Sequence, residues 1–260
     1  MAVPVTPEEK NSPLYKYFER PIDPVPADIL DKIERLDFTP GGGIHPTEKN
    51  IMFEEGYLPG EFGVYMLEDG GMMVANFTPM PGATPEMFDW WFAWHGLASM
   101  RYKIWDKDDH YYCQTQNVEQ ALDSSLSYKE RYWDTTHDVK EAVQGTEPND
   151  LRLHFVRPEY VGWDPEKLKT FGGTIVCTPG PAIMSHFVRP TADGCELRTR
   201  FWLGYMAHDG IIDRIPEMQF TPERGKNLLK HNVKEFTHLA KILPEVYAEF
   251  RDDFTVGLNL

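Results

Sequence analysis

The sequence predicts an α+β fold in which a curved antiparallel sheet folds over one long C-terminal helix. Several strand-like segments follow one another between residues 101 and 204 with no long helix between them, which favours antiparallel pairing. A helical pattern then runs from residue 222 to 250, with apolar residues near a 3.6-residue period. Shorter helical patterns precede the strands, so we also expect a small N-terminal helical part.

The composition is that of a globular protein with an acidic surface. Of the 260 residues, 41% are hydrophobic and 13% are aromatic, which is enough to bury a sizeable core. We expect an arm, a helical part and the first strands over residues 1–100, and a cavity-forming domain over residues 101–260. The net charge of −15 argues against binding to nucleic acid or to an anionic membrane surface.

The three cysteines, Cys113, Cys177 and Cys195, are far apart and not in CxxC spacing. Neither a disulfide framework nor a thiolate zinc site is therefore indicated, and a reducing cytoplasm fits. The N-terminus has no basic region followed by an apolar one, so we expect no secretory signal. No run of 18 apolar residues occurs, so we expect no membrane span.

In the first hundred residues, proline, glycine and cap residues mark the ends of short elements. The Asp69-Gly70-Gly71 turn predicts a hairpin, and Thr84 before Pro85 predicts the N-cap of a helix. The expected elements, in order, are an extended arm with a short helix near 14–20, a helix at 28–36, strands at 61–67 and 71–77, a proline-containing loop at 78–83, and a helix from 85 onward.

Residues 101–204 predict a run of strands joined by turns. Aromatic and branched residues alternate with polar ones, and turn residues such as Asp193-Gly194 separate the segments. The expected strands are 101–105, 110–115, 137–143, 151–156, 173–177, 183–189 and 196–204, with a polar connection at 120–135.

The last long helix carries the first candidate site. Thr221 before Pro222 is the expected N-cap, and Pro244 can kink the helix. His231 and Glu235 are four residues apart, so their side chains leave one face about one turn apart and can hold two positions of one divalent metal. The same spacing is common for plain surface pairs, so the hypothesis needs a second pair of ligands from the sheet.

Two strand segments can supply that second pair. His110 belongs to one segment and Glu141 to another, and strand alternation can turn both side chains toward the helix. Two imidazoles and two carboxylates suit Zn²⁺, and Fe, Co or Mn less strongly. The residues alone leave other candidates open, namely His95, His137, His154, His186, Glu130 and Glu196.

Five motifs occur in a fixed order along the chain. They are Trp90-Trp91-Phe92-Ala93-Trp94-His95, Arg101-Tyr102-Lys103-Ile104-Trp105 with His110, Thr135-Thr136-His137-Asp138-Val139-Lys140-Glu141, Arg198-Thr199-Arg200-Phe201-Trp202-Leu203-Gly204, and His231-Asn232-Val233-Lys234-Glu235. Together they resemble the 2,4-diacetylphloroglucinol hydrolase and phloretin hydrolase family. The resemblance covers most of the chain, and the ordered set is specific where one motif alone is not.

The resemblance implies a zinc-dependent enzyme that hydrolyses the carbon–carbon bond between a phloroglucinol ring and an acyl carbonyl. The substrate would be a small aromatic ketone such as phloretin or an acetylphloroglucinol, and the fold a Bet v 1-like cavity domain in a homodimer. The family's zinc ligands map onto His110, Glu141, His231 and Glu235. The separation of the first pair in the family matches His110 and Glu141, whereas the same count from His95 ends on Leu126, which cannot be a ligand.

The resemblance also implies residues that act on the substrate. Tyr102 matches an active-site tyrosine and His186 a histidine of the pocket, and either could protonate the ring carbon or hold the phenol oxygens. Cys113 and Phe201 stand where one member carries Asn and Tyr, so they would touch the substrate and bear on its identity. Two alternatives stay open: a non-enzymatic binder of hydrophobic aromatic ligands in the same cavity, and a zinc hydrolase of ordinary esters or amides.

Overall fold

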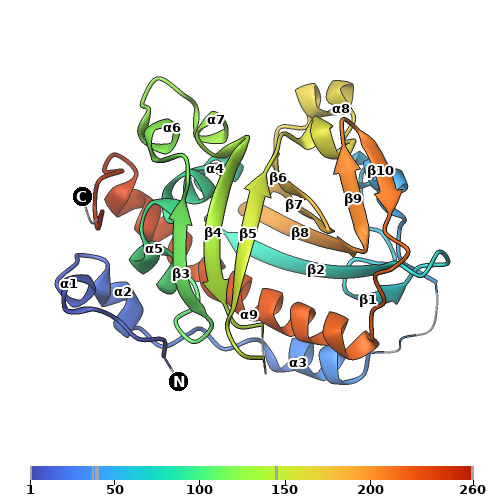
Figure 1. Cartoon of the computed structure of the whole chain (residues 1–260), viewed down its shortest axis with the longest axis horizontal. Coiled ribbons are helices and arrows are strands. Elements are labelled where there is room, and N and C mark those ends of the chain that lie inside the picture. The colour runs from blue at the N-terminus through green and yellow to red at the C-terminus, as the bar shows by residue number, and fades with distance from the viewer. Residues whose placement is uncertain (1, 37, 39–40, 144–145, 259–260) are drawn as a thin grey trace.

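The computed structural model describes residues 2–36, 38, 41–143 and 146–258. Antiparallel sheets curve over one long C-terminal helix, α9 (Pro222–Phe250), with shorter helices around them (Figure 1). This arrangement confirms the predicted combination of antiparallel sheet and long C-terminal helix, and the Bet v 1-like assignment stays a prediction. Among the described residues, none of the helices is both long and apolar enough to cross a membrane.

The larger sheet has five antiparallel strands in the order β1-β2-β8-β7-β6. Side chains alternate between its faces, so Met72 and Val74 of β2 pack in the core between the sheet and α9, while Met73 packs in a separate core on the outer face. Leu229 and Val233 of α9 complete the first of these cores. The strands are β1 (Gly63–Met66), β2 (Met72–Pro81), β6 (Thr174–Pro179), β7 (Ala182–Thr191) and β8 (Gly194–Leu203).

The smaller sheet has three strands in the order β3-β4-β5. A bridge between Val156, just after β5, and Cys177 of β6 joins it to the larger sheet. The strands are β3 (His110–Thr115), β4 (Thr135–Glu141) and β5 (Asn149–Phe155), and a separate two-stranded sheet consists of β9 (Tyr205–His208) and β10 (Ile211–Arg214).

The helix α9 is 29 residues long and begins where the sequence predicts. The hydroxyl of Thr221 accepts a hydrogen bond from the backbone N–H of Arg224 at 3.3 Å, and Pro222 is the first helical residue. The helix runs beneath the sheets (Figure 1), so one of its faces is buried along most of its length. His231 and Glu235 both lie on this buried face.

Short helices precede β1 and fill several of the connections between strands. They are α1 (Pro7–Lys10), α2 (Tyr15–Glu19), α3 (Ala27–Glu34), α4 (Pro85–Trp94), α5 (Ser99–Lys103), α6 (Val118–Leu122), α7 (Tyr128–Tyr132) and α8 (Pro165–Thr170), with 3₁₀ turns η1 (Pro46–Phe53), η2 (His95–Leu97) and η3 (Pro158–Val161). The predicted helices at 14–20, at 28–36 and from 85 are confirmed. The polar connection at 120–135 contains the helices α6 and α7, which the sequence pattern did not indicate.

The predicted strand at 101–105 is wrong, because the segment lies in and just after helix α5. Residues 100–106 are all buried, so the exposed-and-buried alternation of a strand is absent from this described segment. The guanidinium of Arg101 donates to the carbonyl oxygens of Trp94 at 2.8 Å and Val256 at 3.1 Å, which fixes the segment from within. Tertiary packing therefore overrides the strand preference of aromatic residues.

The predicted loop at 78–83 is wrong for its first four residues, because β2 continues to Pro81. Strand β1 pairs only with residues 72–75 of β2, so beyond Ala75 one side of β2 has no partner from β1. Pro79 and Pro81 pair with β8 on the other side. Proline is tolerated there because an edge strand does not need every backbone N–H for pairing.

The N-terminal arm holds the segment that leads into β3. Lys103 forms a buried ion pair with Glu9 at 2.7 Å, and the backbone N–H of Val3 donates to the carbonyl of Lys107 at 2.7 Å. The predicted division of the chain at residue 100 stays a prediction. The larger sheet runs across that division, because β2 pairs with β8 along its whole length.

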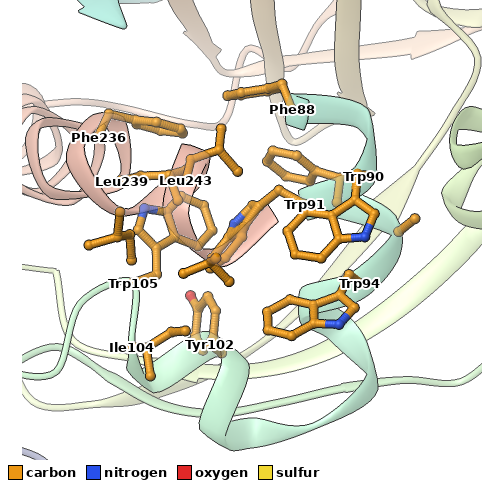
Figure 2. Close-up of a cluster of buried hydrophobic side chains, with 14 of the residues drawn as sticks. Phe88, Trp90, Trp91, Trp94, Tyr102, Ile104, Trp105, Phe236, Leu239 and Leu243 are labelled. Atoms are coloured by element: carbon orange, nitrogen blue, oxygen red, sulfur yellow. The ribbon is translucent and has the colours of Figure 1, made fainter. Parts of the chain in front are cut away.

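An aromatic core lies between α4, α5 and α9. Figure 2 shows Trp91 and Trp105 side by side beneath Phe236 of α9. The ring centroids of Trp91 and Trp105 are 5.9 Å apart and those of Trp105 and Phe236 are 5.2 Å apart. The ring centroids of Trp105 and His110 are 5.2 Å apart, so this core forms one wall of the region around His110.

Replacing Trp91 by alanine is expected to destabilise the protein by about 3–5 kcal/mol, because the side chain is fully buried and its loss leaves a cavity. Urea denaturation followed by circular dichroism measures this free energy of unfolding. Trp133→Ala is the control, since Trp133 is only half-buried and should cost less. Equal destabilisation by the two variants would contradict the packing argument.

Candidate metal centre

The ends of β3 and β4 and the middle of α9 bring four predicted ligands together. His110 opens β3 and pairs directly with Glu141 at the end of β4. The Nε2 atom of His110 lies 3.5 Å from Oε2 of Glu235, and Nε2 of His231 lies 4.0 Å from the same oxygen. One donor atom each of His110, Glu141 and His231 lies within 4.8 Å of the others. The predicted role of these residues as ligands of one ion stays a prediction.

The two imidazoles are held so that their Nε2 atoms point toward Glu235. Nδ1 of His110 donates to the carbonyl of Tyr102 at 3.1 Å, and Nδ1 of His231 lies 3.7 Å from the carboxylate of Asp109. Metal-bound histidines are commonly oriented by such carbonyl or carboxylate partners. Within the described part of the chain, the buried Nε2 of His110 has no hydrogen-bond partner. A buried lone pair facing two carboxylates is a fitting place for a cation.

A chain of amides fixes the carboxylate of Glu235. The amide N–H of Asn76, on β2, donates to Oδ1 of Asn232 at 3.0 Å and to the hydroxyl of Thr78 at 3.1 Å. Because Oδ1 of Asn232 is the acceptor, its amide nitrogen is the donor to Oε1 of Glu235 at 3.0 Å. The other oxygen, Oε2, is then the one that faces His110 and His231. Asn76 and Asn232 are both buried, so this direction is fixed by the fold.

An acidic turn before β3 supports the second imidazole. Lys234 lies 2.8 Å from both Asp106 and Asp109, and Asp109 in turn faces His231. Asp109, Asn76 and Asn232 are not among the site residues that the sequence predicts. The position of Asp109 directly before His110 and of Asn232 directly after His231 was the available signal, and it was weak because neighbours in a strand or helix point in different directions.

Burial sets the protonation of the site in the absence of a cation. It lowers the pKa of His110 well below the usual value, and the neighbouring His231 lowers it further. Burial raises the pKa of Glu235 to about 8. Burial alone would lower the pKa of His231, but Glu235 and Asp109 outweigh it and raise the pKa to about 9. Near neutral pH and without a cation, His231 and Glu235 therefore hold protons.

Tyr102 lies against the cluster. Its ring stacks on that of His110, with the ring centroids 3.8 Å apart and the ring planes at 1° to each other. The hydroxyl of Tyr102 donates a hydrogen bond to Oε2 of Glu141. Burial and the charge of Glu141 raise the pKa of Tyr102 well above the usual value, so the hydroxyl keeps its proton. A protonated phenol beside the candidate ligands has the chemistry of a proton donor.

The other predicted substrate residues lie beyond the aromatic wall. Nδ1 of His186, on β7, is 2.9 Å from the hydroxyl of Thr199, and its ring is 4.9 Å from that of Phe236 and 6.0 Å from that of Phe201. Burial lowers the pKa of His186 to about 3, so the ring is neutral. The alternative ligand Glu130 is exposed and serves the N-terminus of α7 through Ser127.

Cys113 is on the inner face of β3, three residues after His110. Its sulfur lies 3.9 Å from Nδ1 of His137, and burial raises its pKa, so the side chain is a thiol. His95, Cys113 and His137 form a second group of side chains that could hold a metal, and Asp106, Asp109 and His231 form a third. The described part of the chain therefore offers several candidate metal sites. The one that the sequence predicts is the four-residue cluster of His110, Glu141, His231 and Glu235.

The family model described as the DAPG hydrolase PhiG domain matches residues 44–248. A phloretin hydrolase of Eubacterium ramulus is 39% identical over 269 aligned residues, which cover 97% of this chain and 95% of that protein. A 2,4-diacetylphloroglucinol hydrolase of Pseudomonas protegens is 28% identical, with 93% of this chain and 85% of that protein covered. The solution structure of the KanY protein aligns with a TM-score of 0.40 and 12% identity over 67% of this chain and 98% of that one. A score this low carries no argument, so the two sequence relatives and the family model are what bear on function.

Proposed function

Because the chain belongs to the DAPG hydrolase PhiG domain family, we propose that it hydrolyses the carbon–carbon bond between a phloroglucinol ring and an acyl carbonyl, with zinc as its metal. The two relatives are named hydrolases of phloretin and of 2,4-diacetylphloroglucinol, so an aromatic ketone of this class is the proposed substrate. Family membership makes the chain an enzyme, which removes the non-enzymatic binder from consideration.

The observation that carries the proposal is the convergence of two imidazoles and two carboxylates around a buried nitrogen. His110, Glu141, His231 and Glu235 would hold the zinc, since this mixed nitrogen and oxygen set suits that ion. When bound, zinc supplies Lewis acidity, which polarises a carbonyl oxygen and lowers the pKa of a water molecule. A binder of aromatic ligands would need no such buried set of donors.

The remaining chemistry falls to Tyr102. Hydrolysis of an aryl ketone adds water to the acyl carbonyl, breaks the bond to the ring and leaves a proton on the ring carbon. A trihydroxylated ring permits this because protonation at the acyl-bearing carbon turns it into a β-diketone, so the leaving group is an enol and not a bare carbanion. The buried hydroxyl of Tyr102 can deliver that proton, and Glu141 accepts a hydrogen bond from it.

His186 is the alternative donor, and Cys113 and Phe201 are proposed substrate contacts. The neutral ring of His186 and the neighbouring Phe201 offer an aromatic surface with one polar edge. This combination suits binding of the ring or the acyl chain better than proton delivery, because an imidazole with a pKa of about 3 holds no transferable proton at neutral pH.

The test is incubation of the purified protein with phloretin and with acetylphloroglucinols, followed by chromatography of the products. The proposal expects phloroglucinol and the matching carboxylic acid, formed with zinc and lost after treatment with a chelator. Hydrolysis of a simple aryl ester or amide without any release of phloroglucinol from these ketones would overturn it.

Replacing Asn232 by leucine should lower the affinity for zinc by about 10–100-fold, as is typical for partners that orient a metal ligand. The variant removes the donor that holds Oε1 of Glu235 and leaves every proposed ligand in place. Competition with a chromogenic chelator measures the affinity. Asn50→Leu is the control, because Asn50 also makes side-chain hydrogen bonds but to the backbone around Gly162. Unchanged affinity in Asn232→Leu would contradict the positioning role.

Zinc affinity should fall as the pH is lowered. Without a cation, His231 and Glu235 have pKa values raised to about 9 and about 8, so both hold protons below those values. A cation must displace these protons, so its affinity is highest above pH 9 and weakens through both values. Chelator competition across this range measures the change, and a constant affinity would show that zinc does not displace protons from His231 and Glu235.

We also propose a cytoplasmic homodimer. The resemblance and the composition support this, and sedimentation of the purified chain tests the oligomeric state.

A further inference from the structure

A second cluster of metal-binding side chains contains none of the four proposed zinc ligands. It consists of His95 from η2, Cys113 from β3 and His137 from β4, and one donor atom of each lies within 4.8 Å of the others. The side chains are only 3%, 0% and 3% exposed, respectively. Three separate elements thus deliver an imidazole, a thiol and an imidazole to one buried point.

The two imidazoles are fixed by their surroundings. Nδ1 of His95 donates to the carbonyl of Trp91 at 2.8 Å, which leaves Nε2 with its lone pair. The ring of His137 packs closely against Gly96, because a Cβ atom added at Gly96 would lie 2.3 Å from Cε1 of His137. The sulfur of Cys113 approaches Nδ1 of His137 only to 3.9 Å, and a thiol is a weak donor.

The surroundings of the cluster are aromatic and buried. The ring centroid of His95 lies 6.0 Å from that of Trp91 and 5.7 Å from that of Trp105. The ring centroids of His137 and Phe155 are 4.8 Å apart. Burial lowers the pKa of His95 to about 4 and that of His137 well below its usual value, so both rings are neutral ligands. The cluster itself contains no carboxylate, so it does not suit the hard cations Mg²⁺ and Ca²⁺.

We infer that His95, Cys113 and His137 form a second cation site, specific for a thiophilic transition metal and separate from the four-residue cluster. Metal–sulfur and metal–nitrogen bonds of about 2.3 Å and about 2.0 Å place the ligands of one ion about 3.3–3.9 Å apart. The observed 3.9 Å already meets this, and the 4.8 Å limit on the other pairs means that their atoms approach by at most about 1.5 Å on binding. Binding breaks the S–H bond of Cys113, forms a sulfur–metal bond and releases the proton to solvent.

Charge favours Cu⁺ over Zn²⁺ at this site. The charges of a thiolate and Cu⁺ cancel, whereas a thiolate and Zn²⁺ leave one positive charge in a buried, largely apolar interior, which is costly. The guanidinium of Arg101, buried and bonded to the carbonyl of Trp94 next to His95, adds a positive neighbour and increases that cost. This site gives Cys113 a different role from the substrate contact that the family resemblance implies.

The test is an anaerobic titration of the metal-free full-length protein with Cu⁺, in competition with a chromogenic Cu⁺ chelator. We expect the wild type to retain one Cu⁺ that Cys113→Ser and His95→Gln lose. Cys177→Ser is the matched control, because its thiol is equally buried elsewhere, and it should retain the ion. His231→Ala should retain it as well, which separates this site from the proposed zinc site. Full retention in Cys113→Ser would overturn the inference, and so would the absence of both retained Cu⁺ and the cobalt band described below in the wild type.

Titration with Co²⁺ distinguishes the cation. A thiolate ligand gives a sulfur-to-cobalt charge-transfer band in the near ultraviolet, and the four-residue cluster has no sulfur with which to produce one. A band that Cys113→Ser abolishes, without retention of Cu⁺, supports the site and overturns the preference for Cu⁺. Circular dichroism of both site variants confirms that they fold, and because His95 and Cys113 lie on different elements, a folding defect in one does not decide the result.

Discussion

Replacing His231 by alanine is expected to remove the bound zinc and to reduce hydrolysis of the acylphloroglucinol to below about 1% of the wild-type rate. The loss should exceed the ~10–100-fold that removal of an outer partner costs, because a direct ligand is lost. His231 approaches Oε2 of Glu235 at 4.0 Å on the buried face of α9, so its removal also leaves a raised-pKa carboxyl without its neighbour. Glu235 then holds its proton and is a poorer ligand.

The measurements for His231→Ala are elemental analysis of zinc per chain and chromatography of released phloroglucinol. His208→Ala is the matched control, because the His208 side chain is half-exposed. Within the described part of the chain, it forms an ion pair with Asp213 alone. It should keep wild-type zinc and activity. His110→Ala should behave like His231→Ala, since Nε2 of His110 faces the same oxygen at 3.5 Å. A His231→Ala protein with full zinc content and full activity would remove the proposed centre.

Replacing Tyr102 by phenylalanine is expected to lower kcat by about 10²–10⁴-fold, the range for loss of a general acid. The ring stays stacked on His110, so the wall of the site is kept and only the hydroxyl is lost. Zinc content should stay near the wild-type value, because Tyr102 is not a proposed ligand. A fall in kcat with little change in KM separates a proton donor from a residue that only binds the substrate.

Tyr132→Phe is the control for Tyr102→Phe. Tyr132 is equally buried and its hydroxyl donates to Asp89 at 2.9 Å, away from the candidate ligands. Its loss should lower the stability and leave kcat unchanged. If His186 delivers the proton instead, His186→Gln lowers kcat and Tyr102→Phe does not, and the assignment of Tyr102 is then wrong.

The sequence predicted the part of the site that depends on local geometry. His231 and Glu235 needed only a helix with four-residue spacing, and the Thr221 cap and the apolar period indicated that helix. The choice of His110 and Glu141 as the second pair of ligands could not be made from local geometry, because the residues alone left His95 and Glu130 as alternative ligands. The family resemblance resolved this choice, and the register of β3 and β4 places His110 opposite Glu141.

The sequence pattern does not distinguish helix from strand where several residues in a row are buried. Residues 101–105 resemble a strand in composition but form α5 and its end, because packing on all sides removes the alternation that distinguishes the two structures. The same burial hid the second cluster. Cys113, without CxxC spacing, did not indicate a metal site, yet the fold brings it next to His95 and His137.

The sequence by itself determined the elements and the residue types: a long helix with two potential ligands, a run of strands with others, and the family. Only the tertiary structure decided which atoms face one another, such as the Asn76–Asn232–Glu235 amide chain and the carbonyl partner of His110. The physical reason is range. Helix spacing is set by backbone hydrogen bonds between near neighbours, whereas the orientation of a buried polar group depends on partners that are distant in sequence and that only the packed interior supplies.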